Sequence, residues 1–282
     1  MARFDPRLAV NAISDVIQNR PLPLREFDQI YMKAGDMVMQ AEFIARCFDG
    51  RDVIYVGDGD SIGLCVAYLR QRKVIDYGPR RIHVVDFDER IVKAVERFAD
   101  REGMAEIVTS ELYNCIDALP EGLLGQFDAF YTNPPWGSSN DGESVKVFVQ
   151  RGIEALRSAG EGCIVIADDH ELDWARNVLR ETQQFAIRHN FFVQQMQSQV
   201  HSYHLDDAPD LKSCNLFIRA CPGRLPGANS TPLDKQRLEN FYGREKRMHV
   251  RYVRELIRPD YGRAPVGTYN LEHLEKDHGV QA

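Results

Sequence analysis

Short apolar runs alternate with segments of helical periodicity through the middle of the chain. The apolar runs lead into glycine, acidic or proline-containing turns, as buried strands do, and they cover 52–60, 81–88, 105–112, 127–137 and 162–169. Between them, apolar residues recur at helical spacing over 61–71, 89–103, 144–158 and 171–184. Strands joined by helices of this length form a parallel sheet with helices on both faces. The pattern therefore predicts an α/β fold.

The two ends of the chain follow other patterns. Helical spacing predicts helices over 5–20 and 36–47, ahead of the first strand. The β-prone runs 185–204 and 211–220 are expected to pair antiparallel and to close the sheet. A charged segment at roughly 232–258 is predicted to be helical, and the polar residues from Pro259 onward to pack loosely. These patterns divide the chain into an N-terminal helical segment, an α/β domain, and a C-terminal helical extension with a tail, at 1–50, 51–222 and 223–282.

The charge balance is acidic, because 35 Lys and Arg against 42 Asp and Glu leave a net charge of −7. Nucleic acid is bound largely through basic side chains that neutralise phosphates, so this balance disfavours a nucleic-acid partner. No apolar run approaches the length of about 18 residues that spans a membrane, and the start of the chain lacks a secretory pattern. We expect a cytoplasmic protein. The cysteines form no C-x-x-C pair, which argues against disulfides and structural zinc.

Two features at strand ends predict a ligand site, because ligands of parallel sheets bind beyond the carboxyl ends of the strands. The first strand runs into the turn Gly57–Asp60, although its glycines depart from the G-x-G-x-x-G spacing. The second strand ends in Asp86, which in such folds can accept both hydroxyls of an adenosine ribose. The alternative is that Asp86 or Asp88 only caps the helix that starts near Glu89.

The most specific signal is Asn133-Pro134-Pro135-Trp136, which ends the fourth strand. Two prolines stiffen the turn, so the Asn133 side-chain carbonyl and the Pro134 backbone carbonyl become fixed acceptors beside a flat indole. Such acceptors hold an amine and aim its lone pair at an electrophile, which is a positioning effect. The alternative is a rigid turn that only buries the tryptophan.

These features resemble the class I family of methyltransferases and aminopropyltransferases, which bind an adenosyl sulfonium. The match runs from about Val53 to Trp136, and N-P-P-[YFW] tetrapeptides mark enzymes that alkylate amino groups. More narrowly, REFDQIYMKAGDMVMQ ahead of DVIYVGDGDSIGLCVAYL is similar to the branched-chain polyamine synthase family, over roughly 25–220. The resemblance implies a Rossmann-like, mostly parallel seven-stranded sheet with an antiparallel hairpin, which residues 1–50 cover at the cofactor site.

The resemblance also implies an activity. The activity that the resemblance favours is transfer of an aminopropyl group from decarboxylated S-adenosylmethionine to a polyamine such as spermidine. The alternative is methylation by S-adenosylmethionine of an amino group, on a small molecule or, less in keeping with the charge, on a nucleic-acid adenine. The chain departs from the family where Gly59 replaces an aspartate of its Gly-Asp-Asp-Asp signature. It also has Asn133 where an aspartate is common, and only about fifty residues at the position of a winged-helix domain.

A cluster of carboxylates at strand ends is expected to hold the cationic polyamine and to supply a base, since crowding raises a carboxyl pKa. In the alternative reading, Asp169 caps a helix at Glu171. The catalytic candidates are Asp58, Asp60, Asn133, Pro134 and Trp136. Cofactor binding is assigned to Gly57, Asp58, Gly59, Asp86, Phe87, Glu111, Asn114 and Gln29. Substrate binding is assigned to Tyr31, Trp136, Asp168, Asp169, His201 and Tyr203.

Three expectations concern partners. The substrate is a small-molecule polyamine or another amine, without nucleic acid or membrane. No metal is expected, because the spacing of His201 and its acidic neighbours matches no metal motif. The C-terminal region is the candidate surface for pairing two copies into a homodimer.

Overall fold

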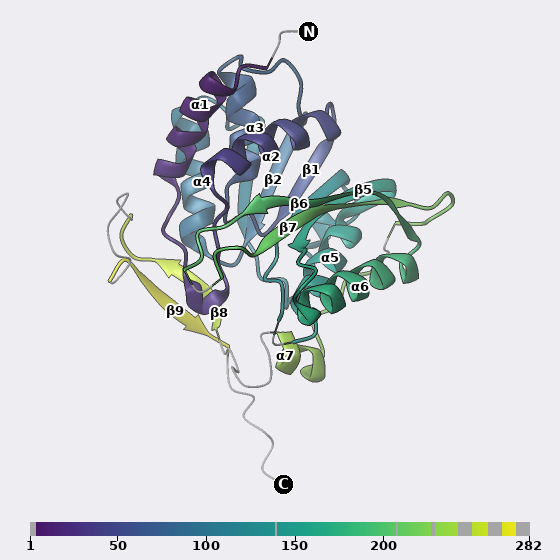
Figure 1. Ribbon diagram of the computed structural model, residues 1–282. Coiled ribbons are helices and arrows are strands. Elements are labelled where there is room, and N and C mark those ends of the chain that lie inside the picture. The colour runs from purple at the N-terminus through teal and green to yellow at the C-terminus, as the bar shows by residue number, and fades with distance from the viewer. Residues whose placement is uncertain are drawn as a thin grey trace.

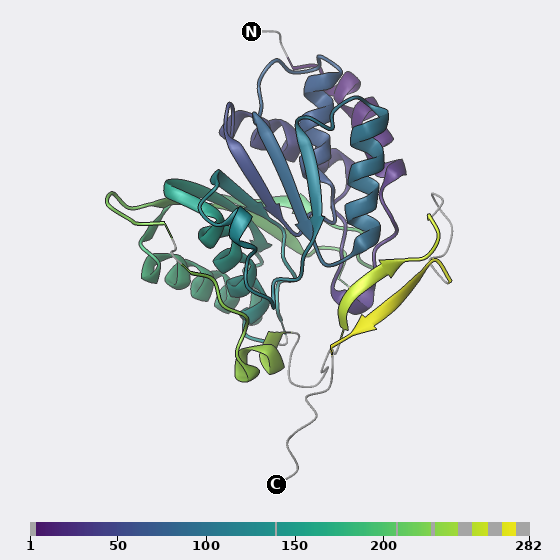
Figure 2. The ribbon, with the colours of Figure 1, turned by 180° about the vertical axis from the view of Figure 1, so that it is seen from behind.

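The computed structural model describes residues 4–138, 140–206, 208–226, 229–241, 250–258 and 267–274. A seven-stranded sheet forms the centre of the molecule (Figures 1 and 2). Its strands are β1 Asp52–Val56, β2 Arg81–Asp86, β3 Val108–Leu112, β4 Phe127–Thr132, β5 Leu156–Ala167, β6 Phe191–Ser202 and β7 Lys212–Ala220. The order across the sheet is β3-β2-β1-β4-β5-β7-β6, and β7 runs in the direction opposite to the other six strands. The expected sheet with an antiparallel pair is confirmed.

Helices cover both faces of this sheet, as the alternation along β1 requires. Val53 and Tyr55 point to one core, whereas Ile54 and Val56 point to the other. The first core is covered by α1 Pro6–Asn19, α2 Ala34–Cys47, α3 Ile62–Gln71 and α4 Glu89–Arg101. The second is covered by α5 Glu143–Ala155, α6 Asp173–Arg188 and α7 Lys235–Phe241. Apart from the segment 232–258, the predicted helices are thus present, with ends shifted by a few residues.

Two secondary-structure predictions are wrong in part. Residues 185–188 continue helix α6, where Ala186 is buried, and the helix stops before Asn190 at φ +63°. Within the segment predicted to be helical, Val250–Glu255 is strand β8, which pairs with β9 Tyr269–His273. The partner strand lies in the part of the chain predicted to pack loosely. A local helical pattern cannot reveal such a pairing, because the partner arrives later in the sequence.

The hairpin of β8 and β9 packs beside the ends of β2 and β3. The N–H of Val253 donates to the carbonyl of Phe87 at 3.2 Å, and Asn114 Nδ2 donates to the carbonyl of Arg251 at 2.6 Å. Leu24, Phe27, Val250 and Val253 form a small apolar cluster between the hairpin and the segment that follows α1. The hairpin therefore braces the loops that follow two adjacent parallel strands.

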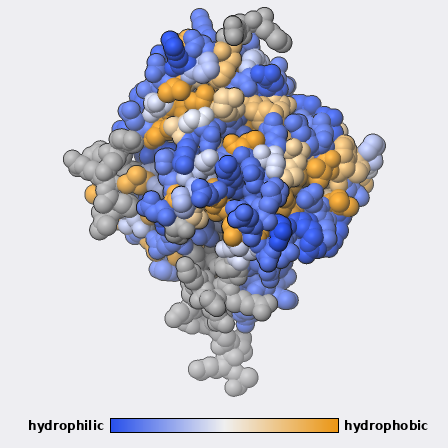
Figure 3. Space-filling view, viewed as in Figure 1, coloured by the Kyte–Doolittle hydropathy of each residue, from blue (hydrophilic) through white to orange (hydrophobic). Residues whose placement is uncertain are grey.

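Hydrophilic residues predominate on the face of the molecule seen in Figure 3, and the hydrophobic ones lie in separate groups. Among the residues that the structure describes, no helix is both long enough and apolar enough to cross a bilayer.

Candidate active site

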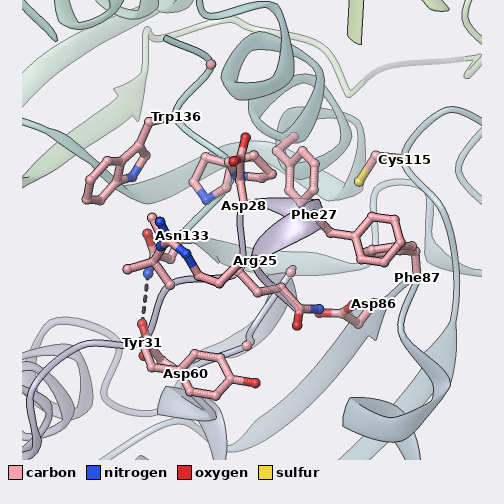
Figure 4. Close-up of a pocket in the computed structure, with 18 of the residues that line it drawn as sticks. Arg25, Phe27, Asp28, Tyr31, Asp60, Asp86, Phe87, Cys115, Asn133 and Trp136 are labelled. Atoms are coloured by element: carbon pink, nitrogen blue, oxygen red, sulfur yellow. Dashed lines mark hydrogen bonds between the residues drawn. The ribbon is translucent and has the colours of Figure 1, made fainter. Parts of the chain in front are cut away.

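A cavity of about 280 Å³ lies beyond the carboxyl ends of β1, β2 and β4. Figure 4 shows Asp60, Asn133 and Trp136 on one side of it and Asp86 and Phe87 on the other. Most of the residues predicted from the sequence line this cavity: Gln29, Tyr31, Gly57, Gly59, Asp60, Asp86, Phe87, Asn114, Asn133, Pro134 and Trp136. We call Asp86, Phe87 and Asn114 the donor wall, and Asp60, Asn133 and Trp136 the acceptor wall.

The glycine turn after β1 brings the chain close to the cavity without a side chain in the way. Gly57 has φ +72°, and a Cβ there would lie 2.6 Å from Phe148 Cε1. At Gly59 a Cβ would lie 3.2 Å from Tyr31 Cε1, so the Tyr31 ring occupies the space of a residue 59 side chain. Aromatic side chains packed around the turn therefore leave no room for a larger residue at either position.

The two aspartates of this turn point in different directions. The carboxylate of Asp58 accepts the N–H groups of Ile62 and Gly63, both at 2.8 Å, and so caps α3. Burial raises the pKa of Asp58 to about 7, against the lowering effect of these two hydrogen bonds. The structure does not bring Asp58 to the cavity, because its side chain faces the helix, so the geometry supports a structural role.

Asp60 lines the cavity and joins three parts of the chain. Its carboxylate accepts the Met32 N–H at 2.7 Å and Asn133 Nδ2 at 2.8 Å, and Arg20 Nη1 lies 3.5 Å away. The Arg20 guanidinium stacks over the Tyr31 ring at 4.1 Å. Burial raises the pKa of Asp60, while Arg20 opposes that shift. A buried carboxyl with a raised pKa beside an amide is suited to accept a proton from a bound amine.

The donor wall is held by short backbone contacts. Asp86 accepts the N–H of Asp88 at 2.9 Å and that of Asp58 at 3.3 Å. Burial, and then the charge of Asp88, raise the pKa of Asp86 to about 7. The capping role considered for Asp88 is confirmed, because it accepts the Arg90 N–H at 3.0 Å at the start of α4. Phe87 meets Phe27 edge to face at 5.4 Å.

Two amide side chains, Asn114 of the donor wall and Gln29 beside it, bind neighbouring loops. Asn114 accepts the Ile116 N–H at 3.2 Å and donates to the carbonyl of Arg251 in the hairpin. Gln29 Nε2 donates to Asp88 at 2.9 Å, and its oxygen accepts the Leu24 N–H at 2.8 Å. The segment after α1 is therefore tied to the loop that follows β2, and the loop that carries Asn114 is tied to the hairpin.

Two contacts hold the Asn133–Trp136 turn in place, one with Ser144 and one with Tyr203. Ser144 Oγ donates to the Pro135 carbonyl at 2.8 Å. Trp136 is 8% exposed and meets the Tyr203 ring edge to face at 4.9 Å. Its indole N–H has no hydrogen-bond partner among the described residues. An aromatic wall beside buried acceptors suits a cationic chain with one amine held in place.

The structure does not bring the remaining predicted residues to the cavity. Glu111 is exposed on β3, with its carboxylate 3.7 Å from His83 Nε2. Asp168 accepts Ser198 Oγ and the Gln199 N–H, beside a separate hollow along α6. Asp169 does not cap a helix, so the capping alternative is wrong: its carboxylate accepts the Glu171 N–H at 2.8 Å in the loop before α6, which begins at Asp173.

His201 and Tyr203 are each 2% exposed and lie behind the acceptor wall rather than in the cavity. The sequence assigned them to the substrate pocket because they belong to a cluster of polar residues near the predicted antiparallel pair. His201 in β6 and Tyr203 just after it instead point into the core, where both bond to Ser213 Oγ.

Several cavity residues carry no motif and were missed. Arg25, Phe27 and Asp28 come from the segment between α1 and α2, and Figure 4 shows Arg25 and Asp28 between the two walls. Phe148 and Trp174 reach the cavity from α5 and α6. Only the adjacency of Asp28 to Gln29 and Tyr31 pointed to this segment. Within the described ranges, no cluster of three His, Cys, Asp or Glu side chains has the arrangement of a metal site.

Comparison with solved structures supports the fold. The branched-chain polyamine synthase of Thermus thermophilus, solved with N4-aminopropylspermidine and 5′-methylthioadenosine, superposes with a TM-score of 0.68 at 21% identity, over 85% of this chain and 70% of that one. A putative RNA methyltransferase of Pyrococcus horikoshii gives 0.55 at 13% identity, over 78% and 98%. These similarities place the chain in the class I methyltransferase-like fold.

Curated sequences point in the same direction. The N(4)-bis(aminopropyl)spermidine synthase of Thermococcus kodakarensis is 34% identical over 155 residues, which are 53% of this chain and 39% of that protein. The enzyme of the same name from Thermus thermophilus is 27% identical over 188 residues, 66% of this chain and 50% of that protein. The chain thus spans half or less of these relatives. The family model for the branched-chain polyamine synthase A C-terminal domain matches residues 9–254, so the chain belongs to that family.

Proposed function

We propose that this chain transfers an aminopropyl group from decarboxylated S-adenosylmethionine to an amine nitrogen of a polyamine such as spermidine. The observation that carries the proposal is that the donor wall and the acceptor wall face each other across one cavity. Membership of the family and the names of the curated relatives support the same reaction.

The donor wall has the groups that an adenosyl ligand requires. In this proposal the Asp86 carboxylate accepts the ribose hydroxyls, and the Phe87 ring packs against the adenine. Asn114, which the hairpin fixes, closes the same side of the cavity. The donor supplies a sulfonium whose adjacent carbon is the electrophile. The chain contributes a preformed surface that holds this carbon in one position.

The acceptor wall prepares the nucleophile. Polyamine nitrogens titrate near the lysine value of about 10, so the reacting nitrogen must first lose a proton. Asp60 is the titratable side chain of this wall, and its carboxylate can accept that proton. The amine lone pair then attacks the carbon beside sulfur, the C–S bond breaks, and its electrons stay on sulfur as a thioether. The proton passes from Asp60 to solvent when the products leave.

The remaining positive charges of the polyamine also need partners. Asp28 and Asp60 give the cavity negative charge, and Trp136 and Trp174 offer aromatic faces for cation–π contacts. The linear shape of a polyamine fits a site with one reactive position and several cation-binding surfaces.

A product assay tests the proposal. The protein is incubated with spermidine and either decarboxylated S-adenosylmethionine or S-adenosylmethionine, and the polyamine products are identified by mass spectrometry. We expect an aminopropylated polyamine and 5′-methylthioadenosine with the decarboxylated donor alone. The variant Asn133→Ala should lose this product. A methylated amine formed only with S-adenosylmethionine would replace the proposal by methyl transfer at the same site.

A further inference from the structure

The loop that follows β3 is largely buried although it is neither helix nor strand. Tyr113, Asn114 and Cys115 line the cavity, and residues 113–116 and 119 are buried. We call residues 113–119 the donor loop, because they include Asn114 of the donor wall. Buried backbone groups need hydrogen-bond partners, which a loop cannot find within a helix or a sheet ladder. The position of the donor loop therefore depends on partners elsewhere in the chain.

One partner is the segment 229–233, which lies between β7 and α7 in the sequence. The Leu119 N–H donates to Ser230 Oγ at 2.8 Å. The Ile116 carbonyl accepts the Leu233 N–H, also at 2.8 Å. This part of the C-terminal region is thus bonded directly to the donor loop.

A buried arginine joins the donor loop to the same segment. Arg151 of α5 is 0% exposed. Its Nε donates to the Cys115 carbonyl and its Nη2 to the Thr231 carbonyl, both at 2.9 Å. Its Nη1 donates to Glu154 Oε2 at 2.8 Å, so a carboxylate in the same helix balances the buried charge. Because the guanidinium is planar and rigid, it sets the positions of the two carbonyls relative to each other.

The Ser230 hydroxyl completes this arrangement. It accepts the Leu119 N–H and Arg151 Nη1, both at 2.8 Å, and it donates to Glu154 Oε2 at 2.6 Å. A hydroxyl has one hydrogen and two lone pairs, so these three bonds use its full capacity. Loss of the hydroxyl would leave a backbone N–H of the donor loop without its partner, and it would remove one acceptor from the guanidinium.

We propose that Ser230 and Arg151 are positioning residues, which hold the donor loop in the conformation that receives the adenine of the donor. The proposal rests on the proposed function, in which this side of the cavity takes the adenosyl group. Neither residue lines the cavity, so both act through the loop and not by contact with the donor. A loop that is already held in its binding conformation loses little freedom when the ligand binds, which favours affinity.

The fixed loop also has a consequence for the choice of base. The Asn114 side-chain oxygen accepts the Ile116 N–H at 3.2 Å, and its nitrogen donates to the Arg251 carbonyl at 2.6 Å. Since a backbone N–H only donates and a carbonyl only accepts, these bonds fix which way the Asn114 amide points. A wrong base leaves polar groups of a rigid loop without partners, whereas a loosened loop can adapt to it. We therefore expect a preference for adenine over hypoxanthine that weakens when the loop is released.

Titration calorimetry with 5′-methylthioadenosine tests the proposal. Ser230→Ala should weaken binding about 10-fold, because a buried hydrogen bond of the donor loop is lost. Ser230→Thr should bind as the wild type does, since it keeps the hydroxyl. In Ser230→Ala the preference over 5′-methylthioinosine should fall, and kcat at saturating donor should stay within about 2-fold of the wild type. An unchanged affinity in Ser230→Ala, or an equal loss in the threonine variant, would overturn the proposal.

Arg237→Ala is the matched control. Arg237 of α7 donates to Glu143 and to Gln150, both at 2.8 Å, and so joins the C-terminal region to α5 through bonds that do not involve the donor loop. We expect the affinity for 5′-methylthioadenosine to stay unchanged in this variant. A loss as large as that in Ser230→Ala would show a general structural effect and would contradict a specific role of Ser230.

A readout without ligand separates this proposal from the proposed function. Amide hydrogen exchange of the free protein, followed by mass spectrometry, should be faster over residues 113–119 in Ser230→Ala than in the wild type and in Ser230→Thr. Unchanged exchange would contradict the positioning role, whether or not a nucleoside binds. Faster exchange with unchanged nucleoside affinity would show that the loop has no part in donor binding, and it would overturn the proposal while leaving the proposed function intact. A wild-type protein that binds no 5′-methylthioadenosine would contradict the proposed function itself.

Discussion

The donor wall and the acceptor wall are held by different kinds of contact. On the donor wall, backbone groups do most of the fixing: the Asp88 N–H binds Asp86, and Val253 binds the Phe87 carbonyl. On the acceptor wall, buried side chains do it: Asp60 accepts the amide of Asn133, and the Tyr203 ring packs edge to face against Trp136. Substitutions on the donor wall should therefore act mainly on affinity, and substitutions on the acceptor wall mainly on rate.

The largest expected effect is on the acceptor wall. Asp60→Asn should lower kcat by roughly 100-fold or more, because the site loses its proton acceptor and an amide now faces the NH₂ of Asn133. Donor affinity, measured by calorimetry, should change only a few-fold. Asp58→Asn is the matched control in the same turn, and it should keep most of the rate because Asp58 caps α3 outside the cavity. Equal losses of rate in the two variants would contradict the division between these aspartates.

A smaller effect is expected on the donor wall. Asp86→Ala should weaken binding of decarboxylated S-adenosylmethionine by about 10-fold to 100-fold, since charged hydrogen bonds to two hydroxyls are lost. At saturating donor, kcat should remain within a few-fold of the wild type. Titration calorimetry and initial rates measure the two quantities separately. A loss confined to kcat would assign Asp86 to the acceptor side.

Donor binding should also depend on pH. The pKa of Asp86 is raised to about 7 by burial and by Asp88, so the carboxylate is mostly protonated at pH 6 and mostly ionised at pH 8. Only the ionised form accepts both hydroxyls, and donor affinity should thus increase several-fold as pH rises through 7. In Asp86→Asn the increase should disappear. A flat profile in the wild type would argue against ribose binding by this group.

The smallest effect concerns the brace formed by the C-terminal hairpin. Arg97 Nη1 and Nη2 donate to the two oxygens of Glu255 at 2.7 and 3.1 Å, which ties β8 to α4. Glu255→Gln should lower donor affinity about 2-fold to 5-fold without changing kcat, because the pair is only partly buried. Glu272→Gln is the control, since Glu272 pairs with Arg254 inside the hairpin. Similar donor affinities for the two variants and the wild type would show that the Arg97–Glu255 ion pair does not affect donor binding.

Much of the fold could be predicted from the sequence because its signals are local. Five parallel strands and their helices are predicted by apolar runs and helical spacing. The Asn-Pro-Pro-Trp motif likewise predicts the turn at Asn133–Trp136, directly after β4. The hairpin of β8 and β9 could not be predicted, because a strand of mixed charged and apolar residues is stabilised by a partner that follows an intervening segment.

The sequence predicts which residues lie near the candidate site, but the direction of each side chain depends on the backbone conformation of the folded chain. Asp58 and Asp60 are alike in type and two residues apart, and the turn conformation decides which of them faces the cavity. Asp168 does end a parallel strand, as predicted, but β5 lies two strands from β1 and its end borders a different hollow. The contact of Tyr203 with Trp136 joins distant parts of the chain, so no sequence motif predicts it.

A crystal structure with 5′-methylthioadenosine and a polyamine bound together is the most direct measurement. We predict that Asn133 Oδ1 lies about 3 Å from the nitrogen to be alkylated and that the ribose hydroxyls lie within hydrogen-bond distance of Asp86. A polyamine nitrogen bound to the NH₂ of Asn133, or a polyamine bound outside the cavity, would contradict it.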